Sequence, residues 1–251
     1  MRLVSIGDSF TEGVGDELPD GSVRGWADLL AQGIATATNA PIQYANLAIR
    51  GRLLEPILRE QLPAALALHP THLTLNGGGN DMLRPRLDAD RLLAQMESAV
   101  RSCLDAGVAP ILIAGPDPGS LAGLPLGARF NRRGTLLTQA IGDLAARNGV
   151  TFVDNFHDFE IRSPGYWCAD RLHLNPAGHT RIATNMLRGL GYPVTIAQRP
   201  PEPHADRSLR GEIEYWQQHV LPWIGRHLRH QSSGDGRTGK HLDWIEVLPQ
   251  S

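Results

Sequence analysis

Cysteine is scarce in this chain, because Cys103 and Cys168 are the only two among 251 residues. Two cysteines are too few for a disulfide framework, and their spacing is not that of a metal site. We therefore expect two buried thiols and no metal site. Free thiols also favour a reducing compartment, so the expected location is cytoplasmic.

Basic runs and long apolar runs are also missing. Lysine occurs once, at Lys240, and the formal net charge is −2. Without a basic patch the chain lacks the electrostatic footprint of a protein that binds nucleic acid or an anionic membrane surface. No apolar run approaches the roughly 20 residues of a membrane helix, and the apolar stretch at residues 3–6 is shorter than a signal peptide requires. The expected partner is a small molecule, with no nucleic acid and no membrane span.

Short segments rich in β-branched residues alternate with longer segments of helical periodicity. The expected strands are residues 2–6, 42–47, 71–75, 109–114 and 151–154. The expected helices, in which apolar residues recur at intervals of three and four, are residues 25–38, 53–68, 90–105 and 129–148. This alternation predicts the α/β class, as a three-layer α/β/α sandwich around a central five-stranded parallel sheet. Functional sites in such sheets form at the carboxyl ends of the strands.

One catalytic domain is expected over residues 1–190, followed by a C-terminal extension over residues 191–251. A chain of this length buries one substantial core, and apolar residues are evenly spread only up to about residue 190. Within the extension, residues 208–229 predict a helix with an apolar stripe, and the Gly- and Ser-rich residues 231–240 predict a flexible linker. The extension either packs on the domain or forms a homo-oligomer, and the sequence leaves both open.

Ser9 stands in the segment GDSFTEG at residues 7–13, in the turn after the first expected strand. A serine hydroxyl is a weak nucleophile at neutral pH and needs a base beside it. Nearby glycines let backbone amides approach a developing oxyanion. The alternative is an ordinary tight turn capped by Asp8 and Ser9, so this segment alone does not identify Ser9 as a nucleophile.

A base for Ser9 is expected in the segment DRLH, where Asp170 precedes His173 by three residues. Asn175 followed by Pro176 marks the start of a helix, which leaves both residues in the loop before it. A carboxylate at this spacing can bond Nδ1–H and leave Nε2 free to take a proton from Ser9. This aspartate singles out His173 among ten histidines. The histidines expected to be structural or solvated are His69, His72, His157, His179, His219 and His227.

Two further turns carry candidate oxyanion donors. Asn80 ends a glycine-rich turn after the third expected strand, and Gly51 lies between the second strand and the next helix. The Asn80 side chain and the Gly51 amide are both able to donate to an oxyanion, although an ordinary turn is the alternative for Gly51. Phosphate binding is the weaker interpretation, because the Gly-Lys-Ser/Thr ending of a P-loop is absent. The long loop at residues 115–127 is expected to wall the site.

Four segments resemble, in order, the blocks of the SGNH hydrolase superfamily, also called GDSL-type esterases and lipases: Ser9, Gly51, Asn80 and His173. The resemblance covers residues 1 to about 190 and includes the DxxH pattern that begins at Asp170. It implies a flavodoxin-like fold with Ser9 as the nucleophile. It further implies an oxyanion hole made by the amides of Ser9 and Gly51 and the side chain of Asn80. Phe10 replaces the leucine of the GDSL motif.

Together these residues predict a serine esterase that hydrolyses carboxylic esters of small or short-chain acyl groups, acetyl esters among them, through an acyl-enzyme on Ser9. Phe10, Arg50 and Arg84 are candidate substrate-binding residues, and the arginines suggest a polar or anionic group on the substrate. The expected substrate is a small-molecule ester, and the scheme requires no cofactor and no metal. Acyl transfer, hydrolysis of thioesters or lysophospholipids, and a non-catalytic interaction module stay open.

Overall fold

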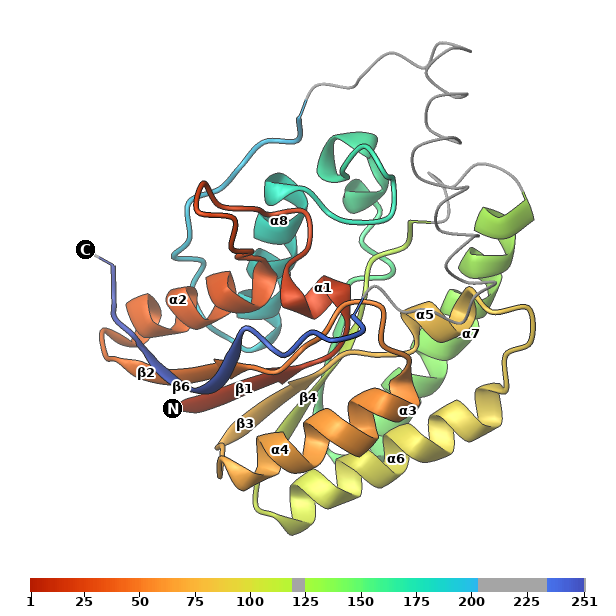
Figure 1. The fold of residues 1–251 in the computed structure, drawn as a ribbon, viewed down its shortest axis with the longest axis horizontal. Coiled ribbons are helices and arrows are strands. Elements are labelled where there is room, and N and C mark those ends of the chain that lie inside the picture. The colour runs from red at the N-terminus through yellow and green to blue at the C-terminus, as the bar shows by residue number, and fades with distance from the viewer. Residues whose placement is uncertain (119–124, 203–233, 251) are drawn as a thin grey trace.

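The computed structural model describes residues 1–118, 125–202 and 234–250. Within them six strands form one sheet in the order β5-β4-β3-β1-β2-β6 (Figure 1). The strands are β1 (Arg2–Ile6), β2 (Ile42–Asn46), β3 (His72–Leu75), β4 (Ala109–Ala114), β5 (Thr151–Asp154) and β6 (His241–Val247). The first five pair in parallel, and β6 pairs with β2 in the antiparallel sense.

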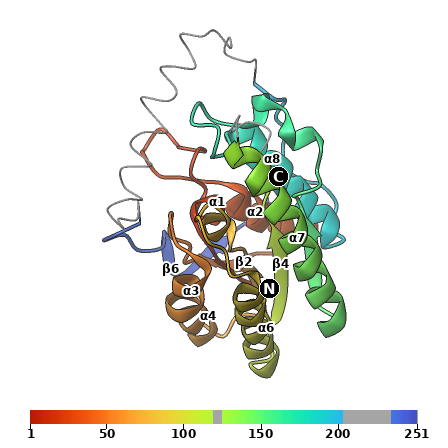
Figure 2. The same ribbon diagram turned by 90° about the vertical axis from the view of Figure 1, so that its right-hand side faces the viewer.

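Helices cover both faces of the sheet (Figures 1 and 2). The helices are α1 (Ser9–Glu12), α2 (Trp26–Thr38), α3 (Leu54–Pro56), α4 (Leu62–Ala67), α5 (Gly79–Met82), α6 (Ala89–Asp105), α7 (Pro125–Asn148) and α8 (Pro176–Gly189). A π-helical turn, η1 (Ile57–Gln61), and two 3₁₀ turns, η2 (Glu160–Arg162) and η3 (Pro164–Tyr166), complete them. The predicted three-layer α/β/α class is confirmed, but the sheet has one antiparallel strand more than the five parallel strands expected.

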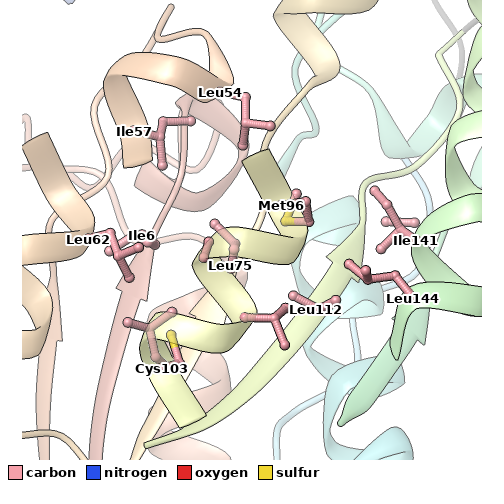
Figure 3. Close-up of a cluster of buried hydrophobic side chains, with 14 of the residues drawn as sticks. Ile6, Leu54, Ile57, Leu62, Leu75, Met96, Cys103, Leu112, Ile141 and Leu144 are labelled. Atoms are coloured by element: carbon pink, nitrogen blue, oxygen red, sulfur yellow. The ribbon is translucent and has the colours of Figure 1, made fainter. Parts of the chain in front are cut away.

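Two apolar cores lie on the two faces of the sheet. One packs α2 and α8 against the sheet, and the other packs α3, α4, α6 and α7 (Figure 3). Successive residues of β4 alternate between them, since Ile111 and Ile113 belong to the first core and Leu112 to the second. Strands buried on both faces are apolar at most positions, and β4, with the sequence APILIA, shows this most clearly.

The helix expected over residues 53–68 is divided into α3, η1 and α4. Pro63 lacks the N–H that a continuous α-helix requires at its position. Just before it the chain widens, and the Leu62 amide donates to the Ile57 carbonyl, five residues back. The helix start predicted from Asn175 and Pro176 is confirmed, because Asn175 caps α8 by accepting from the Gly178 amide at 3.0 Å.

Residues 234–240, expected to belong to a flexible linker, lie against the loop that follows β2. A Cβ on Gly239 would lie 2.6 Å from the Leu47 Cα, and a Cβ on Gly234 would lie 2.2 Å from the Arg50 carbonyl oxygen. The glycines therefore permit close approach of two backbones at these positions. The helix expected over residues 208–229 lies outside the described residues. In the described part of the chain, no helix combines the length and apolar character of a membrane span.

Candidate active site

The site residues gather where the strand order reverses. β1 lies between β2 and β3, so the loops that leave these three strands meet at one end of the sheet. Crevices at such reversal points, outside the carboxyl ends of the strands, are where open α/β sheets bind ligands. Ser9 begins α1 just after β1, Gly51 follows β2, and Asn80 lies in α5 after β3.

Ser9, His173 and Asp170 form a continuous row of hydrogen-bonding groups. The Nε2 atom of His173 lies 3.2 Å from Ser9 Oγ, and its Nδ1 atom lies 2.5 Å from Asp170 Oδ2. With Nδ1 protonated toward the carboxylate, Nε2 is the acceptor that faces the hydroxyl. The arrangement is able to remove a proton from Ser9 and to stabilise the imidazolium that results.

The turn between Asp170 and His173 is fixed by the carboxylate itself. Asp170 Oδ1 accepts from the amides of Leu172 and His173, each at 3.0 Å, while Arg171 adopts a left-handed φ of 54°. Burial would raise the pKa of Asp170, but its bonds to His173 and to these amides bring the pKa below its ordinary value. Asp170 is therefore held ionised as well as oriented.

The loop after β2 brings Gly51 to the site through its neighbour Arg50. Glu12, at the end of α1, accepts from the Arg50 amide at 2.6 Å and binds the Arg50 guanidinium. Gly51 itself has a left-handed φ of 74°. Within the described residues, no hydrogen bond is donated by the amide of Ser9 or of Gly51, so both are available to an oxyanion.

The Asn80 side chain already has partners. Its Nδ2 donates to Asp8 Oδ2 at 3.1 Å and to the Arg52 carbonyl at 2.9 Å. An amide nitrogen carries two hydrogens, so donation from Asn80 to an oxyanion requires that one of these bonds be shared or broken. Asp8 also accepts from the Phe10 amide and caps α1. Burial raises the pKa of Asp8 to about 6.

Gln61 is a residue that the sequence did not point to. Its buried side chain accepts from the Gly7 amide at 2.9 Å and donates to the Gly7 carbonyl at 3.0 Å. The π-helical turn η1 carries it, and such turns often occur at functional sites. No local sequence signal marks the position, because the contact joins residues 54 apart.

The three candidate substrate residues differ in their placement. Phe10 packs on Trp26, with ring centroids 5.4 Å apart, directly beside Ser9. The charge of Arg50 is matched by Glu12. Arg84 is exposed after α5. Of the two arginines, therefore, Arg50 already forms an ion pair with a carboxylate of the protein.

A second Asp–His pair with the same spacing lies after β5. His157 Nδ1 lies 2.7 Å from Asp154 Oδ2, and Asp154 Oδ1 accepts from the amides of Phe156 and His157. No hydroxyl of a described residue bonds His157 Nε2. The two Asp–His pairs thus share the same pattern of hydrogen bonds, although Arg171 has a left-handed φ and the corresponding residue Asn155 does not. Of these two histidines, only His173 lies within hydrogen-bond distance of the hydroxyl of a described serine.

None of the other described histidines forms a hydrogen bond with the Ser9 side chain. His179 is buried and lies within hydrogen-bond distance of the Trp26 amide and the Val14 carbonyl through its two ring nitrogens. Burial lowers its pKa to about 4, so it is a neutral structural residue. His219 and His227 lie outside the described residues. Among the residues that the structure describes, no three His, Cys, Asp or Glu side chains cluster as metal ligands would.

Comparison with known proteins places this site in a family. Residues 5–181 match the GDSL-like Lipase/Acylhydrolase family. Axe2, an acetylxylan esterase from Geobacillus stearothermophilus, is 18% identical with a TM-score of 0.64, covering 78% of this chain and 97% of that chain. TesA is 25% identical with a TM-score of 0.60, covering 76% and 98%. The psychrotrophic esterase EstA from Pseudoalteromonas sp. is 22% identical with a TM-score of 0.58, covering 76% and 97%. No curated protein matches the sequence.

A serine, an imidazole and a carboxylate in hydrogen-bonded order at this end of an α/β sheet define the class of serine hydrolases. The chain belongs to the GDSL-like lipase/acylhydrolase family and is an ester-hydrolysing enzyme. The resemblance to SGNH hydrolases expected from the sequence is thereby confirmed.

Proposed function

We propose that the protein hydrolyses carboxylic esters of small or short-chain acyl groups, acetyl esters among them, through an acyl-enzyme on Ser9. The observation that carries the proposal is the row of contacts from Ser9 Oγ through His173 to Asp170. Each partner in the row supplies what its neighbour lacks: a base for the hydroxyl and an anion for the imidazolium.

In the acylation step, Ser9 Oγ attacks the ester carbonyl carbon while its proton passes to His173 Nε2. The tetrahedral intermediate collapses when the C–O bond to the alcohol breaks and His173 returns the proton to the leaving oxygen. In the deacylation step, water adds to the acyl carbon and gives a proton to His173. The bond between Ser9 Oγ and the acyl carbon then breaks, His173 returns the proton to Ser9 Oγ, and the carboxylic acid leaves.

The developing oxyanion would be held by the amides of Ser9 and Gly51, with Asn80 as the third donor. Asp8 is the partner that Asn80 would share or exchange on binding substrate. Hydrogen bonds of this kind stabilise the transition state more than the ground state, because the charge on the carbonyl oxygen appears only as the bond forms.

Two features support a neutral, short acyl substrate. Arg50, which the sequence suggested as an anion-binding residue, is matched by Glu12, so its charge has an internal partner. Phe10 follows Ser9 and packs against Trp26, and contact of its ring with the acyl group is part of the proposal. Similarity in fold to an acetylxylan esterase agrees with an acetyl group, although it does not identify the alcohol.

A panel of p-nitrophenyl esters of increasing acyl length, measured on the wild type and on Ser9→Ala, tests the proposal. We expect turnover to be highest for the acetyl or butyryl ester and to be lost in Ser9→Ala. Highest turnover with long acyl chains would contradict the acyl specificity, and full activity in Ser9→Ala would contradict the mechanism. An added acceptor alcohol would reveal acyl transfer as a new ester product.

A cytoplasmic location also remains part of the proposal. Free thiols at Cys103 and Cys168 support it, because a reducing compartment leaves cysteines unpaired. Cell fractionation with an antibody to the chain tests the location, and recovery from the culture medium would contradict it.

A further inference from the structure

The C-terminal residues return to the sheet next to the loop that carries Gly51. β6 pairs along β2, from Ile42 opposite Val247 to Asn46 opposite His241 (Figure 1). The preceding residues 234–240 cross the loop after β2, with the close approaches of Gly234 and Gly239 described above. This segment lies beyond residues 5–181, which match the family.

Lys240, the single lysine of the chain, points from this segment toward α1, the helix that begins with Ser9. Its ammonium donates to the Glu12 carbonyl at 2.7 Å and to the Val23 carbonyl at 3.1 Å, and it also contacts the Arg24 carbonyl and the Asp28 carboxylate. The Lys240 side chain is only 14% exposed. Charge-assisted bonds in such a setting are stronger than those at an exposed surface.

Glu12 connects the Lys240 ammonium to the loop after β2, which carries Gly51. Its carbonyl oxygen binds Lys240, while its carboxylate holds both the amide and the guanidinium of Arg50, the residue before Gly51. The helix that begins with Ser9 and ends with Glu12 has only four residues. A helix of one turn has little stability of its own, so its orientation depends on contacts such as these.

We propose that residues 234–247, which lie outside the part of the chain that matches the family, position the catalytic groups, with Lys240 fixing the end of α1 and, through Glu12, the loop that carries Gly51. Lys240 is a positioning residue and touches no reacting atom. The inference rests on the proposed esterase function, because Gly51 matters only if it binds an oxyanion.

The decisive variant replaces Lys240 and its carboxylate partner together, as Lys240→Met with Asp28→Asn. The double change avoids leaving a buried carboxylate without its partner. We expect kcat to fall by about tenfold or more, because small misplacement of catalytic groups is costly, while KM and the melting temperature change little. Lys240→Arg keeps the positive charge and is expected to restore part of the lost kcat.

Gln32→Met is the matched control at the far end of β6. Gln32 donates to the Leu248 carbonyl at 2.7 Å, so this variant weakens the attachment of the same strand without touching Lys240 or Glu12. We expect its kcat to equal that of the wild type. An equal loss of kcat in the control would overturn the assignment to Lys240.

The outcomes separate the two proposals. A wild type without ester turnover and without labelling by a fluorophosphonate would reject the esterase function. An active wild type with unchanged kcat in the folded double variant would reject the positioning role alone. Should the double variant not fold, Lys240→Gln with Asp28→Asn decides: it keeps a neutral donor at this position but loses the charge, and unchanged kcat in it would overturn the inference.

Discussion

His157 lies 2.7 Å from Asp154, Nδ1 to Oδ2, in the same pattern of hydrogen bonds that joins His173 to Asp170. The Asp154–His157 pair is therefore a control within the same chain for the proposed catalytic pair. Of these two histidines, only His173 has the hydroxyl of a described serine within hydrogen-bond distance of Nε2, so similar local hydrogen bonding is expected to have different consequences in the two places.

Substitution of the two histidines tests this difference. His173→Ala should lower kcat by about 10⁴-fold or more, because it removes the base. His157→Ala should leave kcat unchanged, since its imidazole contacts Asp154 and no reacting group. The measurement is steady-state hydrolysis of p-nitrophenyl acetate by both variants, and comparable losses in the two would contradict the assignment.

Asn80 is predicted to act on the transition state although its amide is bound to Asp8 and to the Arg52 carbonyl. Asn80→Ala should lower kcat by about 10²–10³-fold, the usual cost of one oxyanion donor. Asn76→Ala is the matched control, because this amide at the end of β3 donates to the Ile113 carbonyl and should affect stability more than kcat. A loss of kcat in Asn76→Ala equal to that in Asn80→Ala would contradict an oxyanion role for Asn80.

Much of the fold was predictable because its signals are local. The five parallel strands are short segments with several apolar residues, set between longer segments of helical periodicity, and the start of α8 carries Asn175 and Pro176 as cap and first helical residue. β6 gave no such signal, because it lies at the edge of the sheet and its side chains are mostly exposed. Trp244 packs against one core and Val247 against the other, but so few partly buried positions do not produce a regular alternation of apolar and polar residues.

The site was predictable only where chemistry fixes residue type and spacing. In this way the sequence singled out Ser9 and His173, whose side chains the structure brings together. The Asp–His spacing alone was not specific, because Asp154 and His157 have it too. Gln61 and Lys240 were missed because their contacts join residues 54 and 228 positions apart. Contacts of that kind depend on the fold, and periodicity does not encode them.

Gln61 should stabilise the turn before the nucleophile. In Gln61→Leu the buried Gly7 amide loses its acceptor, and an unsatisfied buried donor costs about 1–3 kcal/mol. We expect a loss of this size in the free energy of unfolding measured by urea, together with a lower kcat. Arg59→Ala, an exposed residue in the same turn whose side chain binds Glu55 and Glu60, should change neither quantity appreciably. Wild-type stability in Gln61→Leu would contradict the role.

Asp8 should make stability depend on pH. Burial raises its pKa from 3.8 to about 6, with Asp81 raising it further and His173 opposing. Between these values the folded protein binds more protons here than the unfolded chain, so the free energy of unfolding falls as pH rises through this range. The fall ends above the folded pKa and is absent below the unfolded one.

Asp8→Asn removes that titration. Its free energy of unfolding should decline less steeply with pH across the same window, while Asp28, whose pKa burial also raises to about 6, keeps a slope of the same sign. Urea unfolding at several pH values measures both slopes. Equal slopes in the wild type and the variant would mean that Asp8 titrates normally in the folded protein.

The most direct test of the central claim is to label the protein with a fluorophosphonate and map the modified residue by mass spectrometry. The geometry of Ser9 and His173 predicts a single adduct on Ser9, formed in the His157→Ala variant as in the wild type and greatly slowed in His173→Ala. Labelling of another residue, or labelling of Ser9 at the same rate without His173, would contradict it.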